Sequence, residues 1–337
     1  MILVTGATGL LGAHVVVNLI SNGHKVRAMY RNASKKHVIE QLLLHYNCAN
    51  KSELLALIEW FQGDILDVQS VENAVKECST IIHCAGMVSF ATRDFTELFE
   101  VNRTGTANLV NEALAAKTSY FIHVSSTSAI GSDTLMNDGV KRESNHWNAN
   151  EKTSGYGVSK YSAEKEVWRG VEEGLSAVIV NPSVFFGPGN WSESSLSLFQ
   201  TIQNGLLFYT KGGNAFVDVR DVSEIIGRLL EKKVANERFL IAGHNLLFND
   251  LFSQIAEELK VKPPRILARK FLTEIAWRVV GVVAFILGKK PAITKDAVRG
   301  SHSITQFSSE KIKSLFPDFE FTPIKETIKN TINGKMD

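Results

Sequence analysis

A glycine-rich loop lies directly between an apolar strand candidate and a helix candidate, and this arrangement constrains the fold more than any other feature. The strand candidate is Ile2–Thr5, the helix candidate is Leu10–Ser21, and glycines stand at positions 6, 9 and 12. The first glycine permits a tight turn, the second lets a pyrophosphate approach the backbone, and the third lets the helix pack closely on the strand. Unpaired N–H groups at the helix start attract an anion. The sequence therefore predicts a dinucleotide site at Gly6, Thr8, Gly9, Leu10, Leu11 and Gly12.

Short apolar runs alternate with helical periodicity through the first half of the chain. This alternation predicts right-handed βαβ units, and nearly continuous apolar strands predict a parallel sheet that is covered on both faces. The expected fold class is α/β, with a doubly wound parallel sheet of the Rossmann type. The expected strands are Ile2–Thr5, Lys25–Tyr30, Ile58–Gln62, Thr80–Cys84, Tyr120–Ser125 and Ala177–Val180. The expected helices are Leu10–Ser21, Ser34–His45, Val68–Glu77, Asp94–Lys117 and Tyr156–Glu172.

The pattern changes after Pro182, where a turn-rich segment over residues 186–191 precedes amphipathic helices. Strand-like FVDV and ERFLIA lie among these helices. We expect a dinucleotide-binding domain over residues 1–182, to which strands return from about 215–242, and a smaller, mostly helical substrate lobe over 183–337. The expected helices of this lobe are Ser195–Asn204, Val222–Lys232, Phe248–Leu259, Ser308–Leu315 and Pro323–Ile332.

The apolar segment Phe271–Gly288 is about long enough for a short membrane span. Glu274 and Arg278 lie inside it, however, and each charge at mid-bilayer costs about 2.5–3.5 kcal/mol on insertion scales. Because the two residues are four positions apart, they can pair on one helical face. We therefore expect a helix of the smaller lobe, with an interfacial or dimer-facing helix as the alternative, and no membrane span.

The composition argues against several other classes of protein. The 37 Lys and Arg residues nearly balance the 35 Asp and Glu residues, and a net charge of +2 predicts no nucleic-acid partner. The three cysteines, Cys48, Cys78 and Cys84, show no ligand spacing, so we expect neither a disulfide framework nor a metal site. The opening MILVTGATG lacks the features of an export signal, which predicts a cytoplasmic protein.

Tyr156 and Lys160 are four residues apart at the start of a helix candidate and therefore share a face. A tyrosine with an ordinary pKa of about 10 moves protons poorly at neutral pH, and a neighbouring ammonium lowers that pKa. Ser125 and Ser126 stand at the carboxyl end of the preceding strand, where open α/β sheets bind ligands. We expect Tyr156 to transfer a proton, Lys160 to lower the pKa of Tyr156, and a serine to orient a substrate carbonyl.

These features resemble the extended short-chain dehydrogenases/reductases of the NAD(P)-dependent epimerase/dehydratase superfamily, and in particular the dihydroflavonol reductase and 3β-hydroxysteroid dehydrogenase group. The segment TGATGLLG is similar to the family's TGxxGxxG loop, GDILD to its adenine-side turn, and VNRTGT to its VNxxGT helix start. Ser126 stands five residues before Gly131, as the family's catalytic serine does. The resemblance covers nearly the whole chain, and it implies a homodimer through the helices over 94–117 and 156–172.

The resemblance also implies roles for further residues. Lys160 would bind the cofactor ribose, and Asn102 would support the cofactor groove. The remaining implied cofactor contacts are Asp64 and Ile65 beside the adenine, Ala85 and Gly86 along the dinucleotide, and Pro182, Ser183 and Val184 near the nicotinamide.

The end of the second strand bears on which dinucleotide binds. A carboxylate about 20 residues after the glycine loop would accept hydrogen bonds from the ribose of NAD. The sequence has Tyr30, Arg31 and Asn32 there, and Arg31 could bind a 2′-phosphate. NADP is therefore favoured, and NAD is the alternative.

The expected substrate contacts are Val88, Ser126, Tyr156 and Trp191. Sugar dehydratases of the family follow the strand serine with an Asp-Glu pair, whereas Thr127 and Ser128 stand here, so elimination lacks its acid and base. The candidate lid over 186–198 contains no Arg or Lys, which favours a weakly charged substrate. The sequence thus predicts an NADP-dependent oxidoreductase that reduces an aldehyde or ketone, or oxidises the alcohol. The alternatives are a nucleotide-sugar epimerase with tightly bound NAD(P) and a non-catalytic dinucleotide sensor.

Overall fold

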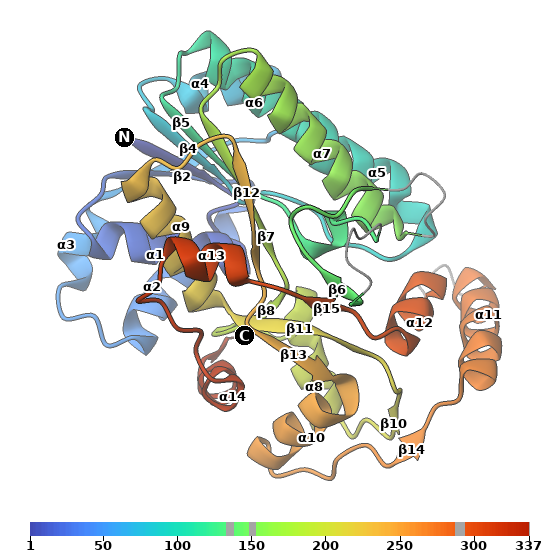
Figure 1. The fold of residues 1–337 in the computed structure, drawn as a ribbon. Coiled ribbons are helices and arrows are strands. Elements are labelled where there is room, and N and C mark those ends of the chain that lie inside the picture. Colours follow the sequence, from blue (N-terminus) through green and yellow to red (C-terminus); the bar gives the residue numbers. More distant parts are fainter. Residues whose placement is uncertain (133–137, 148–152, 287–293, 337) are drawn as a thin grey trace.

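The structure, a computed structural model, describes residues 1–132, 138–147, 153–286 and 294–336. Its centre is a seven-stranded parallel sheet in the order β12-β7-β5-β4-β1-β2-β3 (Figure 1). The order reverses at β1, which pairs with β2 on one side and β4 on the other, and this is the Rossmann arrangement that the sequence predicts. The strands are β1 (Ile2–Thr5), β2 (Val26–Tyr30), β3 (Ile58–Gln62), β4 (Thr80–His83), β5 (Tyr120–Val124), β7 (Ala177–Pro182) and β12 (Glu237–Ile241).

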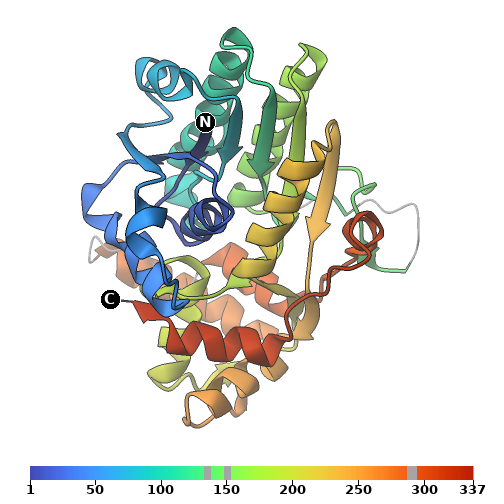
Figure 2. The ribbon, with the colours of Figure 1, turned by 90° about the vertical axis from the view of Figure 1, so that its left-hand side faces the viewer.

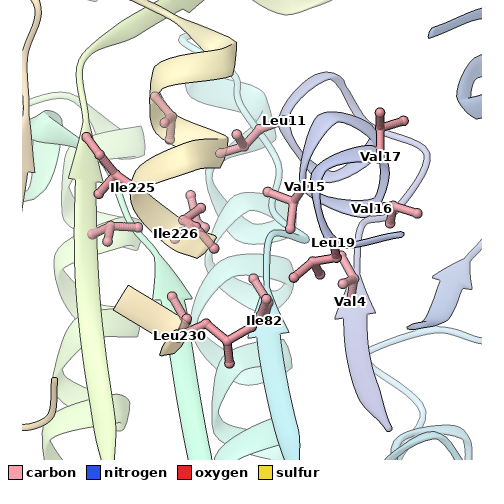
Figure 3. Packing of buried hydrophobic residues seen from close by; sticks show 14 of the residues in the cluster. Val4, Leu11, Val15, Val16, Val17, Leu19, Ile82, Ile225, Ile226 and Leu230 are labelled. Carbon is pink, nitrogen blue, oxygen red and sulfur yellow. The ribbon is translucent and has the colours of Figure 1, made fainter. Parts of the chain in front are cut away.

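Helices cover both faces of the sheet, because its buried strands are apolar on both sides. Leu3 and Ile81 belong to the cluster on one face, whereas their chain neighbours Val4 and Ile82 belong to the cluster on the other. Figure 3 shows Val4 and Ile82 beside Val15 of α1 and residues of α9. One face carries α1 (Leu10–Ser21), α2 (His37–His45), α3 (Lys51–Leu55), α9 (Val219–Lys232) and α13 (Glu310–Leu315). The other carries α4 (Val68–Val75), α6 (Gly105–Ala115) and α7 (Gly155–Glu172).

The long helix expected over Asp94–Lys117 is instead three segments. A short α5 (Phe95–Phe99) leads into a π-helical turn, η3 (Glu100–Thr104), before α6 begins. A π-helical turn inside a helix often marks a functional site, because it redirects a side chain. Here it contains the buried Asn102, which bonds to the loop after β4.

The smaller lobe lies beyond the carboxyl ends of the sheet (Figures 1 and 2). Of the two strand-like segments expected to return to the central sheet, ERFLIA does so as β12, whereas FVDV lies in a separate sheet of order β13-β11-β8. The strands of this lobe are β8 (Val184–Phe186), β9 (Gly189–Asn190), β10 (Phe208–Tyr209), β11 (Gly213–Asp218), β13 (His244–Leu247), β14 (Ile266–Leu267) and β16 (Lys335–Met336). Its helices include α8 (Ser197–Gln203), α10 (Phe248–Glu258) and α14 (Ile324–Asn333), which share an apolar cluster. A short pair, β6 (Val140–Lys141) and β15 (Gln306–Phe307), joins the two parts of the chain.

Residues 271–286 of the apolar segment form most of a helix, α11 (Lys270–Ile286), which packs against α12 (Lys295–His302), and residues 287 and 288 lie outside the described residues. Within the part of the chain that the structure describes, no helix is long and apolar enough to cross a membrane. Glu274 and Arg278 of α11 form the expected ion pair, with Oε2 and Nη1 2.8 Å apart.

Candidate active site

A cleft of about 360 Å³ lies at the carboxyl ends of β1, β4 and β5, where the strand order reverses. Open α/β sheets bind ligands at this position, because the loops there diverge to opposite faces of the sheet. The glycine loop forms one wall, and the loop after β4 and the first turns of α7 form another. Residues 185–196 of the smaller lobe and Met336 close the cleft from the opposite side.

The glycines of the loop are required by geometry. Gly6 has a φ of +65°, and a Cβ there would lie 2.7 Å from the backbone nitrogen of Ala85. A Cβ on Gly12 would lie only 2.1 Å from the carbonyl oxygen of Gly6, so no side chain fits at this contact. Both glycines therefore let backbone segments approach as closely as the loop demands.

The cleft residues fit a dinucleotide. Gly9 begins α1 without a side-chain cap, and the first turn of this helix contains no acidic residue, so its N–H groups are open to an anion. The residues of the predicted dinucleotide site all line the cleft, namely Gly6, Thr8, Gly9, Leu10, Leu11 and Gly12, and their contact with a dinucleotide stays a prediction.

The structure places Ser126 beside Tyr156, on the helix that also carries Lys160, but the serine that lines the cleft is Ser125 and not Ser126. The side chain of Ser154 caps α7 by accepting a hydrogen bond from Gly157 N, which places Tyr156 in the first turn. Ser126 lies close enough to the phenol of Tyr156 to lower its pKa, whereas Ser125 is buried and donates to Glu164. Both Tyr156 and Lys160 line the cleft, and Lys160 Nζ donates to the carbonyl of Val124 at 2.7 Å.

The electrostatics of the pair differ from the sequence expectation. Burial raises the pKa of Tyr156 above its ordinary value, and the neighbouring Ser126 hydroxyl opposes this effect. Burial also lowers the pKa of Lys160 to about 8, although the charge of Glu164 acts in the opposite direction. The phenol of the protein alone is therefore held protonated at neutral pH, and the ammonium titrates close to the physiological range.

A buried polar network connects α7 to the central sheet. Glu164 is almost fully buried, and its Oε1 accepts hydrogen bonds from Ser125 Oγ and Asn181 Nδ2, each at 2.5 Å. Its Oε2 is 3.3 Å from Arg238 Nη1. The network joins β5, α7, β7 and β12, and sequence reasoning missed it because its members are far apart in the chain. The only local signal was the position of Glu164, one turn after Lys160.

Asn102 holds the loop that follows β4. Its side chain accepts a hydrogen bond from Met87 N at 2.8 Å and donates to Met87 O at 3.0 Å and to Ser159 Oγ at 2.9 Å. A Cβ on Gly86 would approach Asn102 Oδ1 to 3.2 Å. Asn102 therefore positions Gly86 and Met87, which line the cleft, in line with the supporting role that the resemblance implies.

Other residues named from the sequence lie elsewhere. Trp191, expected to contact the substrate, is buried in the core of the smaller lobe against Phe199, because its large apolar surface packs better there than in an open cleft. Arg31 is exposed at the end of β2 and does not line the cleft. Val88 does line it. The implied cofactor contacts Asp64, Ile65, Ala85, Pro182, Ser183 and Val184 are not among the lining residues.

The cleft wall also includes residues that the sequence did not indicate. Lys35 and His37 line it beyond the glycine loop, and Lys35 Nζ pairs with Glu193 Oε1 at 2.5 Å. This ion pair connects the first lobe to the segment over 185–196. A basic residue shortly after the second strand was visible in the sequence, but its partner lies 158 residues away and could not be inferred.

The doubly wound sheet and its glycine loop define the class of Rossmann-fold proteins that bind nicotinamide dinucleotides. The model of the NAD dependent epimerase/dehydratase family matches residues 2–242. The chain is 31% identical over 269 residues to sterol demethylase protein B of Methylococcus capsulatus, a match that covers 78% of this chain and 76% of that protein. It is 26% identical over 344 residues to cinnamoyl-CoA reductase 1 of Petunia hybrida, with 99% and 91% covered.

Among solved structures, that of gox2253 matches with a TM-score of 0.80 and 28% identity over 99% of this chain and 97% of that chain. The protein belongs to the NAD-dependent epimerase/dehydratase family, within the extended short-chain dehydrogenases/reductases, whose members are NAD(P)-dependent oxidoreductases and epimerases.

Replacing Gly12 by Ala tests the close contact between α1 and the loop. We expect Gly12→Ala to lower the free energy of unfolding by about 1–3 kcal/mol, because the new Cβ would overlap the Gly6 carbonyl. The variant should also lose measurable NADPH binding in calorimetric titration. Gly300→Ala is the control, since a Cβ there meets no atom within 4 Å. Unchanged NADPH affinity in Gly12→Ala would contradict the assignment of the loop.

Proposed function

We propose that the protein uses NADPH to reduce a ketone or aldehyde group on a largely apolar molecule. The observation that carries this proposal is that Tyr156 and Lys160, one helical turn apart, both line the glycine-loop cleft, with Ser126 beside the phenol of Tyr156. Two neighbouring hydroxyl groups can bind one carbonyl oxygen from two directions. The same arrangement supports oxidation of the alcohol when the reaction runs in reverse.

The chain's own residues move the proton. Ser126 would donate a hydrogen bond to the carbonyl oxygen and fix its position, and Tyr156 would transfer its phenolic proton to that oxygen as negative charge develops there. A reduced nicotinamide, when bound, supplies the hydride that the carbonyl carbon accepts. The Lys160 ammonium then stabilises the phenolate that remains. Tyr156 regains its proton from water, which reaches its partly exposed ring.

The raised pKa of Tyr156 favours reduction over oxidation, because it keeps the phenol protonated in the free protein. A proton donor must be protonated when the substrate binds, and burial keeps this phenol neutral. The charge of Lys160 acts mainly after proton transfer, when it meets a phenolate rather than a phenol.

The side chains near Tyr156 favour an apolar substrate. Val88 and Phe90 are exposed in the loop after β4, and the Phe90 ring lies 5.9 Å from that of Tyr156. Among the described lining residues, the only lysine or arginine side chains are Lys35, which is paired with Glu193, and Lys160. A second diphosphate, on the substrate, would find no further Lys or Arg among these lining residues. The name of one relative refers to a sterol, which contains apolar rings, and that of another refers to cinnamoyl-CoA, in which an apolar ring is joined to a charged carrier.

NADP is favoured over NAD by the end of β2. Arg31 stands there in place of a carboxylate, and it makes no ion pair among the residues that the structure describes. Lys36 is less available, because its ammonium lies 4.8 Å from the ring centres of both Tyr30 and Trp60. We assign the 2′-phosphate to Arg31, with NAD as the alternative cofactor.

An epimerase is the second candidate, because the family model that matches the chain includes epimerases and the same three residues would serve that reaction. A panel of carbonyl compounds and nucleotide sugars, followed at the absorbance of NADH and NADPH in parallel, separates the two. Net consumption of NADPH supports the reductase. A tightly held nucleotide with no net consumption supports the epimerase. A sensor without chemistry would give neither result.

The homodimer through the helices over 94–117 and 156–172 and the cytoplasmic location stay predictions. Analytical ultracentrifugation of the purified protein tests the first of these directly.

Tyr156→Phe removes the proton donor and keeps the ring. We expect kcat for carbonyl reduction to fall by about 100- to 10,000-fold, with nearly unchanged NADPH affinity, because one general acid contributes that much. Tyr161→Phe on the same helix is the matched control, since Tyr161 stacks on Trp147 at 4.3 Å and does not line the cleft. Equal activity of Tyr156→Phe and the parent protein would overturn the mechanism.

The pKa of Lys160 predicts the alkaline limb of the pH profile, which is the decrease in the rate of carbonyl reduction at high pH. Below about pH 8 the ammonium is present and stabilises the phenolate, and above it this stabilisation is lost, so the reduction rate should fall as pH rises through about 8. Because the Glu164 charge raises the pKa of Lys160, Glu164→Gln should move this limb to lower pH. Glu172→Gln, at the exposed end of α7, should leave it in place. An unmoved limb in Glu164→Gln would contradict this role.

Arg31→Glu tests the choice of cofactor. Losing a charged contact and adding a repulsive carboxylate should weaken NADPH binding by about 10- to 100-fold and leave NADH binding almost unchanged. Lys25→Glu, at the opposite end of the same strand, makes the same change of charge and should affect neither nucleotide. Fluorescence titration with both nucleotides measures the effect. An equal change for NADH and NADPH would argue against a 2′-phosphate contact.

A further inference from the structure

Helix α11 presents a stripe of apolar side chains that nothing in the described structure covers. Phe271, Ile275 and Val279 are exposed to 73%, 46% and 55%, and their four-residue spacing places them on one face. Leu272 extends the stripe and is also exposed. Figure 1 shows α11 at the edge of the molecule with α12 beside it. Thr273 ties the opposite face of α11 to α12 through a hydrogen bond of 2.8 Å to the His302 ring.

Further exposed apolar side chains lie on β14, which precedes α11, on its partner strand β10, and just after α12. Leu207 and Phe208 are exposed at β10, and Ile266 is exposed on its partner strand β14, which ends three residues before α11 begins. Ile304 is exposed just after α12. Of the sixteen large apolar side chains that are exposed among the described residues, eight belong to this region. Such a concentration exceeds the scattered exposure that is normal on a soluble surface and indicates a binding surface.

The same region is strongly basic. The described residues 262–286 and 294–302 contain seven Lys or Arg residues and two acidic residues, whereas the whole chain has a net charge of only +2. The rest of the chain is therefore net negative. Arg269 and Lys270 are exposed directly before the apolar stripe, and Lys295 and Arg299 are exposed on α12. The acidic Glu274 is neutralised by its ion pair with Arg278.

We infer that α11, together with β10, β14 and α12, is a docking surface that lies on a lipid bilayer with anionic headgroups. An apolar stripe with basic residues along its flanks is the pattern of a helix in the plane of a membrane interface. The apolar side chains would enter the boundary between headgroups and acyl chains, and the cations would contact lipid phosphates. The surface is separate from the cleft, because none of its exposed residues lines that site.

The charge argues against a second copy of the chain as the occupant of this surface. A symmetric dimer through α11 would bring two regions with the same strong positive charge together, and like charges repel at an interface. An anionic bilayer complements that charge. A peripheral position also agrees with the absence, among the described helices, of one that could span a membrane.

Sedimentation with lipid vesicles tests the inference on the full chain. The protein should bind vesicles of about 30% phosphatidylglycerol in phosphatidylcholine. This composition gives a negative surface charge similar to that of a cytoplasmic leaflet. The protein should bind phosphatidylcholine alone much more weakly, and 0.5 M salt, which shortens the Debye length to about 4 Å, should release it. Arg269→Gln and Lys270→Gln should each lower the partition coefficient by about fivefold.

The apolar contribution is tested by the double variant Leu272→Asp with Val279→Asp, which should lower partition by more than about tenfold. Leu44→Asp is the matched control, because Leu44 is a helical leucine that is 50% exposed on the other lobe. Its partition should change little. Circular dichroism and thermal unfolding check that the double variant is folded, since all substituted side chains are on the surface.

Three outcomes would overturn the inference. The first is no binding to anionic vesicles at low salt, and the second is binding that the double Asp variant retains in full. The third is a concentration-dependent dimer that the double variant abolishes without any vesicle binding by the parent protein, which would assign the surface to a second copy.

Discussion

The packing of helix α1 against the loop that follows β1 is the contact on which the site depends. Gly12 and the Gly6 carbonyl approach so closely that no side chain fits between them, and this contact fixes the direction of the helix. The open N–H groups of its first turn then face the cleft. Because β1 is paired on both sides, the loop cannot shift without moving the centre of the sheet. The amino end of α1, which we expect to bind the anion, is thus attached to a strand that is paired on both sides.

A second set of contacts aligns the proton-transfer residues with that loop. Lys160 donates to the carbonyl of Val124 at the end of β5, and β5 is separated from β1 only by β4. Glu164 extends the connection to β7 and β12 through Asn181 and Arg238. Burying a carboxylate is costly unless it is paired and hydrogen-bonded, and here both conditions are met. The network connects α7 to three strands of the sheet, so these strands together fix the position of α7 and of Tyr156.

The smaller lobe separates two environments. Its cleft-facing segment contains no Lys or Arg, whereas Arg269, Lys270, Lys295 and Arg299 place positive charge on the outside. A nearly neutral net charge therefore conceals an uneven distribution. In the functions proposed here, the weakly charged cleft suits an apolar carbonyl compound, and the basic, apolar exterior suits the membrane from which such a compound could partition. The proposed carbonyl reduction and the proposed membrane binding rest on different residues, so a result that contradicts one leaves the other unaffected.

Local patterns were sufficient for the elements near the glycine loop. The expected Ile2–Thr5, Leu10–Ser21 and Ile58–Gln62 coincide with β1, α1 and β3, although β1 is fully buried and β3 is a half-exposed edge strand. The π-helical turn around Asn102 was not predictable from local pattern. The hydrogen-bond partner of the Asn102 side chain, Met87, lies 15 residues away. The residue types and spacing of the Tyr156–Lys160 pair were likewise visible in the sequence.

The chain by itself determined the fold class, the family and the position of the phosphate loop, because these depend on short-range glycine spacing and on the periodicity of apolar residues. Tertiary structure decided that Trp191 fills a core instead of meeting a ligand, that Lys35 pairs with Glu193 across the cleft, and that burial raises the pKa of Tyr156. It also left the stripe of α11 uncovered. Burial and pairing are set by residues distant in the chain, and a linear pattern contains no record of which distant groups will become neighbours.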